Sequence, residues 1–191
     1  PQLTILAILT GGPCGGKTSC LSELKQILNK TLRGKARTFS TVEAATLTYS
    51  SGIERQKDLD NNIRNLLAFQ KCLYTTQMAL EVAILTLASE LTAETKEDII
   101  LLIDRGPLDS KGYMAPQAWE ELLRQINRTE EDIMNRYDIV VHLTSTAIGA
   151  ESFYGTATNQ FRMESLDQSR IQDGKEWDSW TQHPLHIRIP N

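Results

Sequence analysis

The residues best suited to chemistry lie in one glycine-rich segment near the start of the chain, residues 11–18. Its sequence, GGPCGGKT, fits the pattern G-x-x-x-x-G-K-[ST] of a phosphate-binding loop. Glycines let backbone N–H groups turn towards phosphate oxygens, and a helix that begins near Gly16 directs its positive dipole end at the same anion. We expect Lys17 to contact the β- and γ-phosphates and Thr18 to ligate Mg²⁺. The predicted nucleotide-binding residues are Gly12, Pro13, Cys14, Gly15, Gly16, Lys17, Thr18 and Ser19.

An acidic residue follows the most apolar run of the sequence, residues 99–103 (IILLI). A run of isoleucine and leucine is typical of a strand that is buried on both faces of a parallel sheet. Asp104 then lies at the carboxyl end of that strand, in the crevice where such sheets bind ligands, and could hold Mg²⁺ directly or through water. The alternative is a simple strand-ending turn, Asp-Arg-Gly-Pro.

Two further charged residues come directly after Asp104. The planar guanidinium of Arg105 suits phosphate recognition, so this residue could contact a phosphoryl group or an acceptor. It could also merely pair with Asp109 on the surface. Asp109 is a candidate acceptor-binding carboxylate, with a helix cap as the alternative.

Glu43 follows the second predicted strand, residues 36–42. A carboxylate there faces the same crevice and could activate an acceptor hydroxyl, although a helix-start carboxylate stabilised by the helix dipole is the alternative. Arg162 and Arg170 lie between the fourth and fifth predicted strands. Small-molecule P-loop kinases carry a lid there whose arginines close on the transferred phosphoryl group. Ordinary solvated charges are the other interpretation.

A polar stripe runs along the predicted helical region 56–91. Gln70, Gln77 and Glu81 share one helical face by their spacing, so they could line an acceptor pocket. Such a stripe is also typical of a polar helix face in contact with solvent.

Alternating short apolar runs and helical patterns predict the elements that position these residues. The predicted strands are residues 3–9, 36–42, 99–103, 139–143 and 185–189. The predicted helices are residues 16–32, 56–91 (one or two helices), 117–126, 130–135 and 164–181. We expect an α/β fold of the P-loop NTPase type, a kinase-like three-layer αβα sandwich whose five-stranded parallel sheet has the order 2-3-1-4-5.

Length and charge argue against several classes of protein. The chain has 191 residues, with 20 Lys and Arg against 24 Asp and Glu. The length predicts a single nucleotide-binding domain over residues 1–191, which we expect to be the N-terminal part of a longer protein. The acidic balance argues against binding to nucleic acid. Three cysteines are too few for a disulfide framework and favour a cytoplasmic location.

Contact with a membrane is expected to be weak at most. No transmembrane segment is predicted, because Glu81 and Thr86 interrupt the apolar stretch of residues 79–88, which is typical of a buried helix. The basic segment of residues 30–37 could still give a local, weak contact with anionic lipid.

In combination, these motifs resemble one family, the P-loop AAA-type domain shared by NadR-like nicotinamide riboside kinases and the TRPL-translocation-defect proteins, with more similarity to the second, eukaryotic branch. The resemblance covers essentially the whole chain. It rests on residues 11–18, Glu43-Ala44-Ala45-Thr46, Phe69-Gln70 with Gln77, Asp104-Arg105-Gly106 with Asp109, Lys111, Tyr113 and Met114, Arg136-Tyr137-Asp138 with His142-Leu143, Gly149-Ala150-Glu151 with Phe153-Tyr154, Asn159, Arg162, Glu164, and His183-Pro184.

The resemblance implies a kinase-like fold that binds ATP or GTP with Mg²⁺. By position, Gly16, Lys17 and Thr18 would bind phosphate and Mg²⁺, and Asp104 and Arg105 would lie beside the γ-phosphate. The implied lid residues are Tyr154, Asn159 and Arg162. Relatives in the eukaryotic branch look like nucleotide-binding regulators of trafficking, some with affinity for GTP and anionic phospholipid.

We therefore expect a Mg²⁺-dependent domain that binds a purine nucleoside triphosphate. It would transfer the γ-phosphate to the hydroxyl of a small molecule, or hydrolyse it. In the transfer, Arg105 and Arg162 would neutralise developing charge, and Glu43 or Asp109 would position the acceptor. The alternative is a regulatory GTP- or ATP-binding module with slow or no catalysis, acting in trafficking or phospholipid binding. Sequence does not distinguish ATP from GTP.

Overall fold

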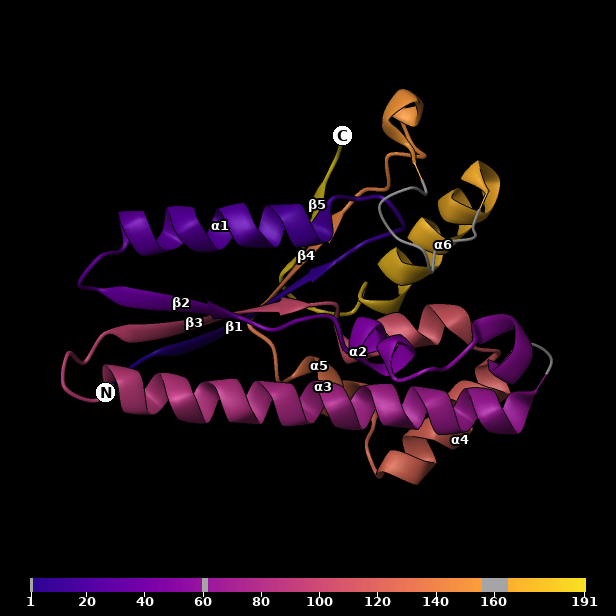
Figure 1. Ribbon diagram of the computed structural model, residues 1–191, viewed down its shortest axis with the longest axis horizontal. Coiled ribbons are helices and arrows are strands. Elements are labelled where there is room, and N and C mark those ends of the chain that lie inside the picture. The colour runs from indigo at the N-terminus through magenta and orange to yellow at the C-terminus, as the bar shows by residue number, and fades with distance from the viewer. Residues whose placement is uncertain (1, 60–61, 156–164) are drawn as a thin grey trace.

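A five-stranded parallel sheet forms the centre of the molecule (Figure 1). The computed structural model describes residues 2–59, 62–155 and 165–191. The strands lie in the order β2-β3-β1-β4-β5, which confirms the predicted α/β class and strand order. Their bounds are β1 (Thr4–Thr10), β2 (Ala36–Ser40), β3 (Asp98–Asp104), β4 (Ile139–Leu143) and β5 (His186–Ile189).

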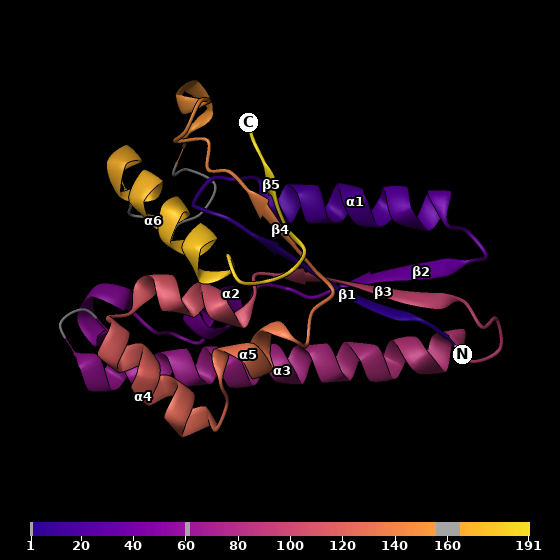
Figure 2. The ribbon, with the colours of Figure 1, turned by 180° about the vertical axis from the view of Figure 1, so that it is seen from behind.

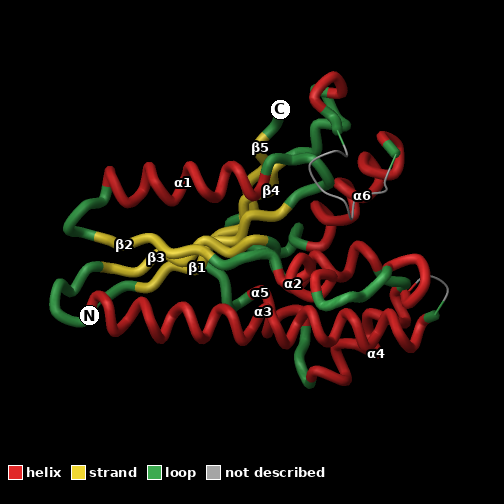
Figure 3. Tube along the Cα trace, viewed as in Figure 1, coloured by secondary structure: helices red, strands yellow, loops and turns green. Residues whose placement is uncertain are grey.

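Helices cover both faces of this sheet, as the tube view shows (Figure 3). They are α1 (Lys17–Thr31), α2 (Ala44–Ser50), α3 (Ile63–Thr92), α4 (Pro116–Ile126), α5 (Glu130–Met134) and α6 (Leu166–Ser179). Shorter helical turns span Arg55–Leu59, Pro107–Tyr113 and Glu151–Phe153. Most of the region predicted as one or two helices over residues 56–91 is the single helix α3.

The buried strand β3 explains the three layers. Ile100 and Leu102 point into one core with Leu21 of α1, whereas Leu101 and Ile103 point into a second core on the opposite face. Successive side chains of a strand point to opposite faces, so an apolar run such as IILLI requires cover on both sides. The helix α1 lies on one side of the sheet and α3 on the other, as the view from behind also shows (Figure 2).

The register of the strands places the chemistry at one edge of the sheet. In the pairing of β1 with β3, Leu9 lies opposite Asp104, and in the pairing of β1 with β4, Thr10 lies opposite His142. The phosphate-loop segment follows Thr10 directly. It therefore begins beside Asp104 because all the strands are parallel and end at the same edge.

The long helix α3 is more exposed than the sequence predicts. By length and composition alone, this one helix of the described ranges could cross a membrane; its most apolar window has a mean hydropathy of 1.2, and 17% of that window is buried. Core helices of soluble proteins pass the same test, so this is weak evidence. Residues 79–88 were predicted to be a buried helix, but Val82 and Leu87 are 59% and 56% exposed. The inward face of this stretch carries Glu81 and Ala88, which are fully buried, and Ile84 and Leu85, which are partly buried against the core.

Glu81 attaches α3 to the segment between α5 and β4. Its Oε2 accepts a hydrogen bond from Arg136 at 2.7 Å, and its Oε1 accepts from the Tyr137 hydroxyl at 2.9 Å and from Gln77 Nε2 at 3.0 Å. A buried carboxylate is tolerated only when such partners replace water. The three donors supply that replacement.

Replacement of Glu81 by alanine is expected to lower the free energy of unfolding by about 2–4 kcal/mol, because the Tyr137 hydroxyl and Arg136 then lose a buried partner. Chemical denaturation measures this change. Glu90→Ala, at an exposed position of the same helix, is the matched control and should change stability by less than about 0.5 kcal/mol. Equal effects of the two substitutions would contradict the role given to Glu81.

Candidate functional site

The glycine-rich segment forms a tight turn between β1 and α1. Gly11 has a φ of 127°, and a Cβ atom at this position would collide with the carbonyl oxygen of Leu143. Gly16 has a φ of 72° and caps the start of α1 without any side-chain hydrogen bond. Both positions favour glycine for conformational reasons. The turn leaves the amino end of α1 open towards the site, as a phosphate-binding loop requires.

Lys17 is buried at the centre of this turn. Its ammonium group donates to the carbonyl oxygens of Gly11 at 2.5 Å and Gly12 at 2.7 Å. Burial, together with the nearby positive charge of Arg105, lowers the pKa of Lys17 to about 8. An anion that approaches Lys17 would stabilise the charged form of the ammonium group.

Thr18 and Asp104 form the candidate metal site. The Thr18 hydroxyl lies 3.4 Å from Asp104 Oδ2. Burial is the largest reason that the pKa of Asp104 is raised, and the negative charge of Glu43 adds to it. Hydroxyl and carboxylate oxygens suit Mg²⁺, which usually takes its other ligands from phosphates and water. Within residues 2–59, 62–155 and 165–191, no group of three or more His, Cys, Asp or Glu side chains could hold a metal ion.

Arg105 is paired with three carboxylates. It lies 2.7 Å from Glu43, 3.2 Å from Glu176 and 3.6 Å from Asp109. Burial opposes the charge of Arg105, but these carboxylates outweigh it and raise its pKa well above the usual value. The predicted alternative, a pair between Arg105 and Asp109, is present, but the pair is buried and not on the surface, because Asp109 is 4% exposed and Arg105 is mostly buried.

Glu43 and Asp109 differ in how their oxygens are occupied. Glu43 receives Arg105 on Oε1 and the Thr46 hydroxyl on Oε2 at 2.7 Å. Burial raises the pKa of Glu43, but Arg105 and Thr46 outweigh burial and hold this pKa below its usual value. Asp109 accepts from Trp180 Nε1 on Oδ1 at 2.7 Å, and its buried Oδ2 makes no hydrogen bond but faces the Arg105 guanidinium at 3.6 Å. Burial, with the charge of Glu176, raises the pKa of Asp109 to about 6.

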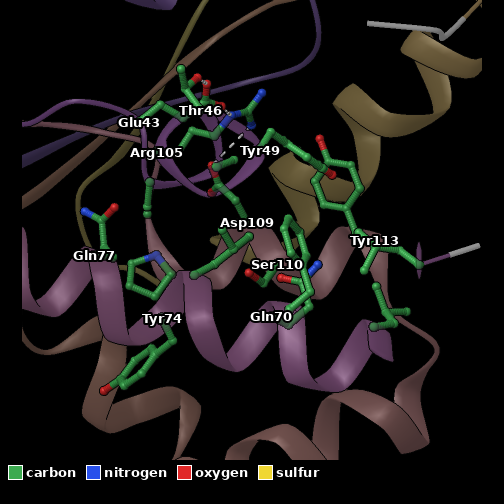
Figure 4. Close-up of a pocket in the computed structure, with 18 of the residues that line it drawn as sticks. Glu43, Thr46, Tyr49, Gln70, Tyr74, Gln77, Arg105, Asp109, Ser110 and Tyr113 are labelled. Carbon is green, nitrogen blue, oxygen red and sulfur yellow. Dashed lines mark hydrogen bonds and ion pairs between the residues drawn. The ribbon is translucent and has the colours of Figure 1, made fainter. Parts of the chain in front are cut away.

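A cavity of about 320 Å³ opens beside these charged residues. Gln70 and Gln77 rise into it from α3, and Glu43, Arg105 and Asp109 lie across from them (Figure 4). Glu81, the third member of the predicted polar stripe, does not line the cavity. Pro13 of the glycine-rich turn is also part of the lining. The cavity therefore borders the turn.

The predicted lid is only partly described. Arg162 and Asn159 lie outside the described residues. Arg170 is bound to Glu151 at 3.1 Å and Asp167 at 2.9 Å, on the surface. The Tyr154 hydroxyl lies 2.7 Å from the Ser169 hydroxyl.

Sequence reasoning missed two buried acids on α6. Glu176 accepts from the Tyr113 hydroxyl at 2.7 Å besides its pair with Arg105. Asp173 Oδ1 accepts from the backbone N–H groups of Gly12 at 3.1 Å and Ser145 at 2.8 Å. Asp173 also lies 3.1 Å from His142, with Arg188 on its second oxygen. Asp173 and Glu176 are three residues apart and so share one face of α6, but acids of a solvated helix often have the same spacing.

Asp173 accepts a hydrogen bond from the Gly12 N–H of the predicted phosphate loop, so Asp173→Ala is expected to weaken binding of ATP or GTP with Mg²⁺ about tenfold. Calorimetric titration measures the affinity. Asp167→Ala, an exposed acid on the same helix, is the control and should leave the affinity unchanged. An unchanged affinity in Asp173→Ala would show that the loop keeps its shape without this contact.

Comparison with known proteins identifies one matching family and two solved structures with a similar fold. The model of a family described as AAA domain matches residues 6–185. A search of curated proteins finds no match. Among solved structures, the chain is similar to the NadR protein in complex with NAD and AMP-PNP, with a TM-score of 0.60 and 13% identity. That similarity covers 99% of this chain and 45% of the NadR chain, so this chain spans less than half of NadR.

A second similar structure is thymidylate kinase from Ehrlichia chaffeensis. Here the TM-score is 0.57 and the identity is 14%, over 100% of this chain and 88% of that chain. At these identities the likeness establishes a shared fold. The fold is that of P-loop kinases, with the same parallel sheet and flanking helices.

Proposed function

The chain belongs to the AAA-domain family, and from that premise we propose that it binds a nucleoside triphosphate with Mg²⁺ and transfers the γ-phosphate to a hydroxyl group of a small molecule. The observation that carries this proposal is that the cavity borders the predicted phosphate loop. Pro13 of the loop and the acids Glu43 and Asp109 line the same space. A bound acceptor would therefore lie next to a bound γ-phosphate.

The residues of the loop bind and orient the triphosphate in this proposal. The open amino end of α1 and the Lys17 ammonium hold its phosphates. Thr18 and Asp104 would hold Mg²⁺, which supplies positive charge at the phosphates when it is bound. The kinase fold shared with NadR, whose structure contains AMP-PNP, supports this arrangement.

Asp109 is the better candidate for the proton acceptor. Both oxygens of Glu43 accept hydrogen bonds, whereas Asp109 Oδ2 is buried, accepts none and lies 3.6 Å from Arg105. The acceptor oxygen forms a bond to the γ-phosphorus while the bond to the β–γ bridging oxygen breaks, and the nucleoside diphosphate leaves with the electron pair. The hydroxyl proton passes to Asp109 Oδ2. Arg105 positions Asp109 and Glu43 through its ion pairs.

The cavity also favours transfer over a purely regulatory role. A regulatory module, such as the eukaryotic trafficking branch that the sequence resembles, needs a nucleotide site but no acceptor space. The cavity of about 320 Å³ lies within the range of roughly 300–1,000 Å³ that is usual for small-molecule sites. We therefore propose a kinase in preference to a regulator.

Calorimetric titration with ATP and GTP, each with and without Mg²⁺, tests the first half of this proposal. We expect at least one triphosphate to bind in a Mg²⁺-dependent way. Release of the corresponding diphosphate in the presence of hydroxyl-bearing acceptors then tests transfer. Failure of both triphosphates to bind would remove the proposed function altogether.

A further inference from the structure

One nitrogen of Arg105 lies between two carboxylates. Arg105 Nη1 is 3.2 Å from Glu176 Oε2 and 3.6 Å from Asp109 Oδ2, and Arg105 Nε is 2.7 Å from Glu43 Oε1. The two shorter contacts are hydrogen bonds, whereas 3.6 Å is too long for one. Arg105 is therefore held towards Glu43 and Glu176. Asp109 Oδ2 is left without a hydrogen bond beside the guanidinium, and both residues are labelled in the close-up (Figure 4).

Glu176 is held in place by two neutral donors. It is fully buried on α6, and its Oε1 accepts from the Tyr113 hydroxyl at 2.7 Å and from Gln172 Nε2 at 3.2 Å. Tyr113 belongs to the Pro107–Tyr113 turn, which also carries Asp109. Neutral donors orient a carboxylate without cancelling its charge. The second oxygen of Glu176 therefore keeps its attraction for Arg105.

Arg105 would close on Asp109 if Glu176 carried no charge. A hydrogen bond between a guanidinium and a carboxylate is strong, and a buried carboxylate gains most from such a partner. Arg105 Nη1 would then shorten its contact with Asp109 Oδ2 from 3.6 Å to hydrogen-bond length. That contact would occupy the oxygen to which the proposed mechanism transfers the acceptor proton. Glu176 itself does not line the cavity, so it acts through Arg105 alone.

We propose that Glu176 is a positioning residue of the transfer reaction, which holds Arg105 Nη1 away from Asp109 Oδ2 and so keeps this oxygen open to the acceptor hydroxyl. The inference rests on the proposed function and adds a residue that touches neither the nucleotide nor the acceptor. Asp173, three residues earlier on α6, accepts from the Gly12 N–H. One face of α6 therefore supports both the predicted phosphate loop and Arg105.

The pKa of Asp109 agrees with this geometry. Burial raises it to about 6, the negative charge of Glu176 adds to burial, and Arg105 opposes both. A base whose pKa lies near the working pH accepts a proton most effectively. The charged and titratable groups around Asp109 and its cavity are Lys17 of α1, Glu43 before α2, Arg55, Arg105 after β3, Tyr113 of the same turn and Glu176 of α6, while α3 presents the neutral amides of Gln70 and Gln77.

An NMR titration of the Asp109 side-chain carboxyl carbon tests the proposal. The protein is free of nucleotide and Mg²⁺, and the signal is assigned by its loss in Asp109→Asn. We expect a pKa of about 6 in the wild type. Glu176→Gln keeps the size of the side chain and removes its charge, so the pKa of Asp109 should fall by about one pH unit. Asp178→Asn, an exposed acid on α6, is the matched control and should leave this titration unchanged.

Two results of this titration would overturn the proposal. One is a pKa of Asp109 in the ordinary range of aspartate in the wild type, because Arg105 would then already be closed on Asp109. The other is the same pKa of Asp109 in the wild type and in Glu176→Gln. The first result needs no variant, so the proposal can fail even if Glu176→Gln does not fold.

Tyr113→Phe separates the charge of Glu176 from a merely structural role. It removes the Tyr113 hydrogen bond to Glu176 but leaves the carboxylate in place. We expect the pKa of Asp109 to stay at about 6 in this variant, because Arg105 keeps its pair with Glu176. If Tyr113→Phe lowered this pKa as much as Glu176→Gln does, the effect would come from disturbed packing of α6, and the proposal would be wrong.

The pH profile of diphosphate release from ATP or GTP with Mg²⁺, with water as the acceptor, gives the kinetic readout. In Glu176→Gln, we expect the pH of half-maximal kcat to move down together with the pKa of Asp109, and the KM of the triphosphate to stay unchanged. An unmoved profile would contradict the proposal. If a triphosphate binds and the Asp109 titration is the same in Glu176→Gln, this inference fails alone. If neither triphosphate binds, the proposed function fails and takes this inference with it.

Discussion

Replacement of Lys17 by alanine is expected to weaken the binding of ATP or GTP with Mg²⁺ at least about a hundredfold and to abolish phosphate transfer. The Lys17 ammonium is buried in the turn before α1, where its charge is poorly screened by water. Loss of that charge removes the strongest attraction for the β- and γ-phosphates. Calorimetric titration of the purified variant measures the effect.

Lys30→Ala is the matched control for this prediction. Lys30 lies in the last turn of α1, is exposed, and should leave nucleotide affinity unchanged. Lys17 also donates to the carbonyl oxygens of Gly11 and Gly12, so the variant must be shown to be folded by its thermal transition. Normal affinity in a folded Lys17→Ala protein would mean that the turn is not the phosphate site.

The pKa of Lys17 adds a pH dependence to the same site. Burial lowers this pKa to about 8, so the free protein loses the Lys17 proton as the pH rises through 8. Bound phosphate favours the charged form, and binding above pH 8 must therefore take up a proton. We expect wild-type affinity for the triphosphate to fall between pH 8 and pH 9.5, and an affinity that is constant over this range would contradict this account.

The fold could be predicted from the sequence because its signals are local. The apolar run of residues 99–103 is typical of a strand covered on both faces, and a phosphate-binding loop such as residues 11–18 usually joins a strand to a helix. Together they define a parallel sheet with its ligand crevice beside Asp104. Asp104 and Thr18 lie together for the same reason, since both follow directly from these two segments.

The carboxylates around Arg105 could be predicted only in part. Glu43 and Asp109 follow strands and were expected at the crevice, but Glu176 lies 71 residues from Arg105 on a polar helix. Nothing in the local pattern separates Glu176 and Asp173 from solvated acids such as Asp167. Their burial depends on how α6 packs against the Pro107–Tyr113 turn, which is a tertiary contact. The exposure of Val82 on α3 also depends on tertiary packing, because Ile84 and Leu85 of the same helix pack against the core whereas Val82 does not.

The unsatisfied oxygen of Asp109 leads to the second large expected effect. Asp109→Asn is expected to lower kcat for phosphate transfer about 10²- to 10⁴-fold, because the asparagine amide cannot take up the acceptor proton. Asparagine keeps an oxygen that can accept from Trp180 Nε1, and Arg105 retains Glu43 and Glu176. Wild-type activity should also fall as the pH drops through about 6, where Asp109 becomes protonated.

The same substitution is expected to stabilise the fold at neutral pH. Because its pKa is raised, Asp109 binds its proton more tightly in the folded state than in the unfolded state, so wild-type stability falls as the pH rises from about 4 to 6. Asp109→Asn removes this buried charge, and we expect its free energy of unfolding at pH 8 to exceed that of the wild type by about 1–3 kcal/mol. Chemical denaturation at pH 4 and pH 8 measures the difference, with Asp167→Asn as the exposed control. A loss of stability at pH 8 would mean that Arg105 needs the Asp109 carboxylate for folding. If Asp109→Asn is more stable and also has a lower kcat, the charge of Asp109 destabilises the fold but is needed for catalysis. A carboxylate with a structural role alone would stabilise the protein, so its removal would lower the free energy of unfolding.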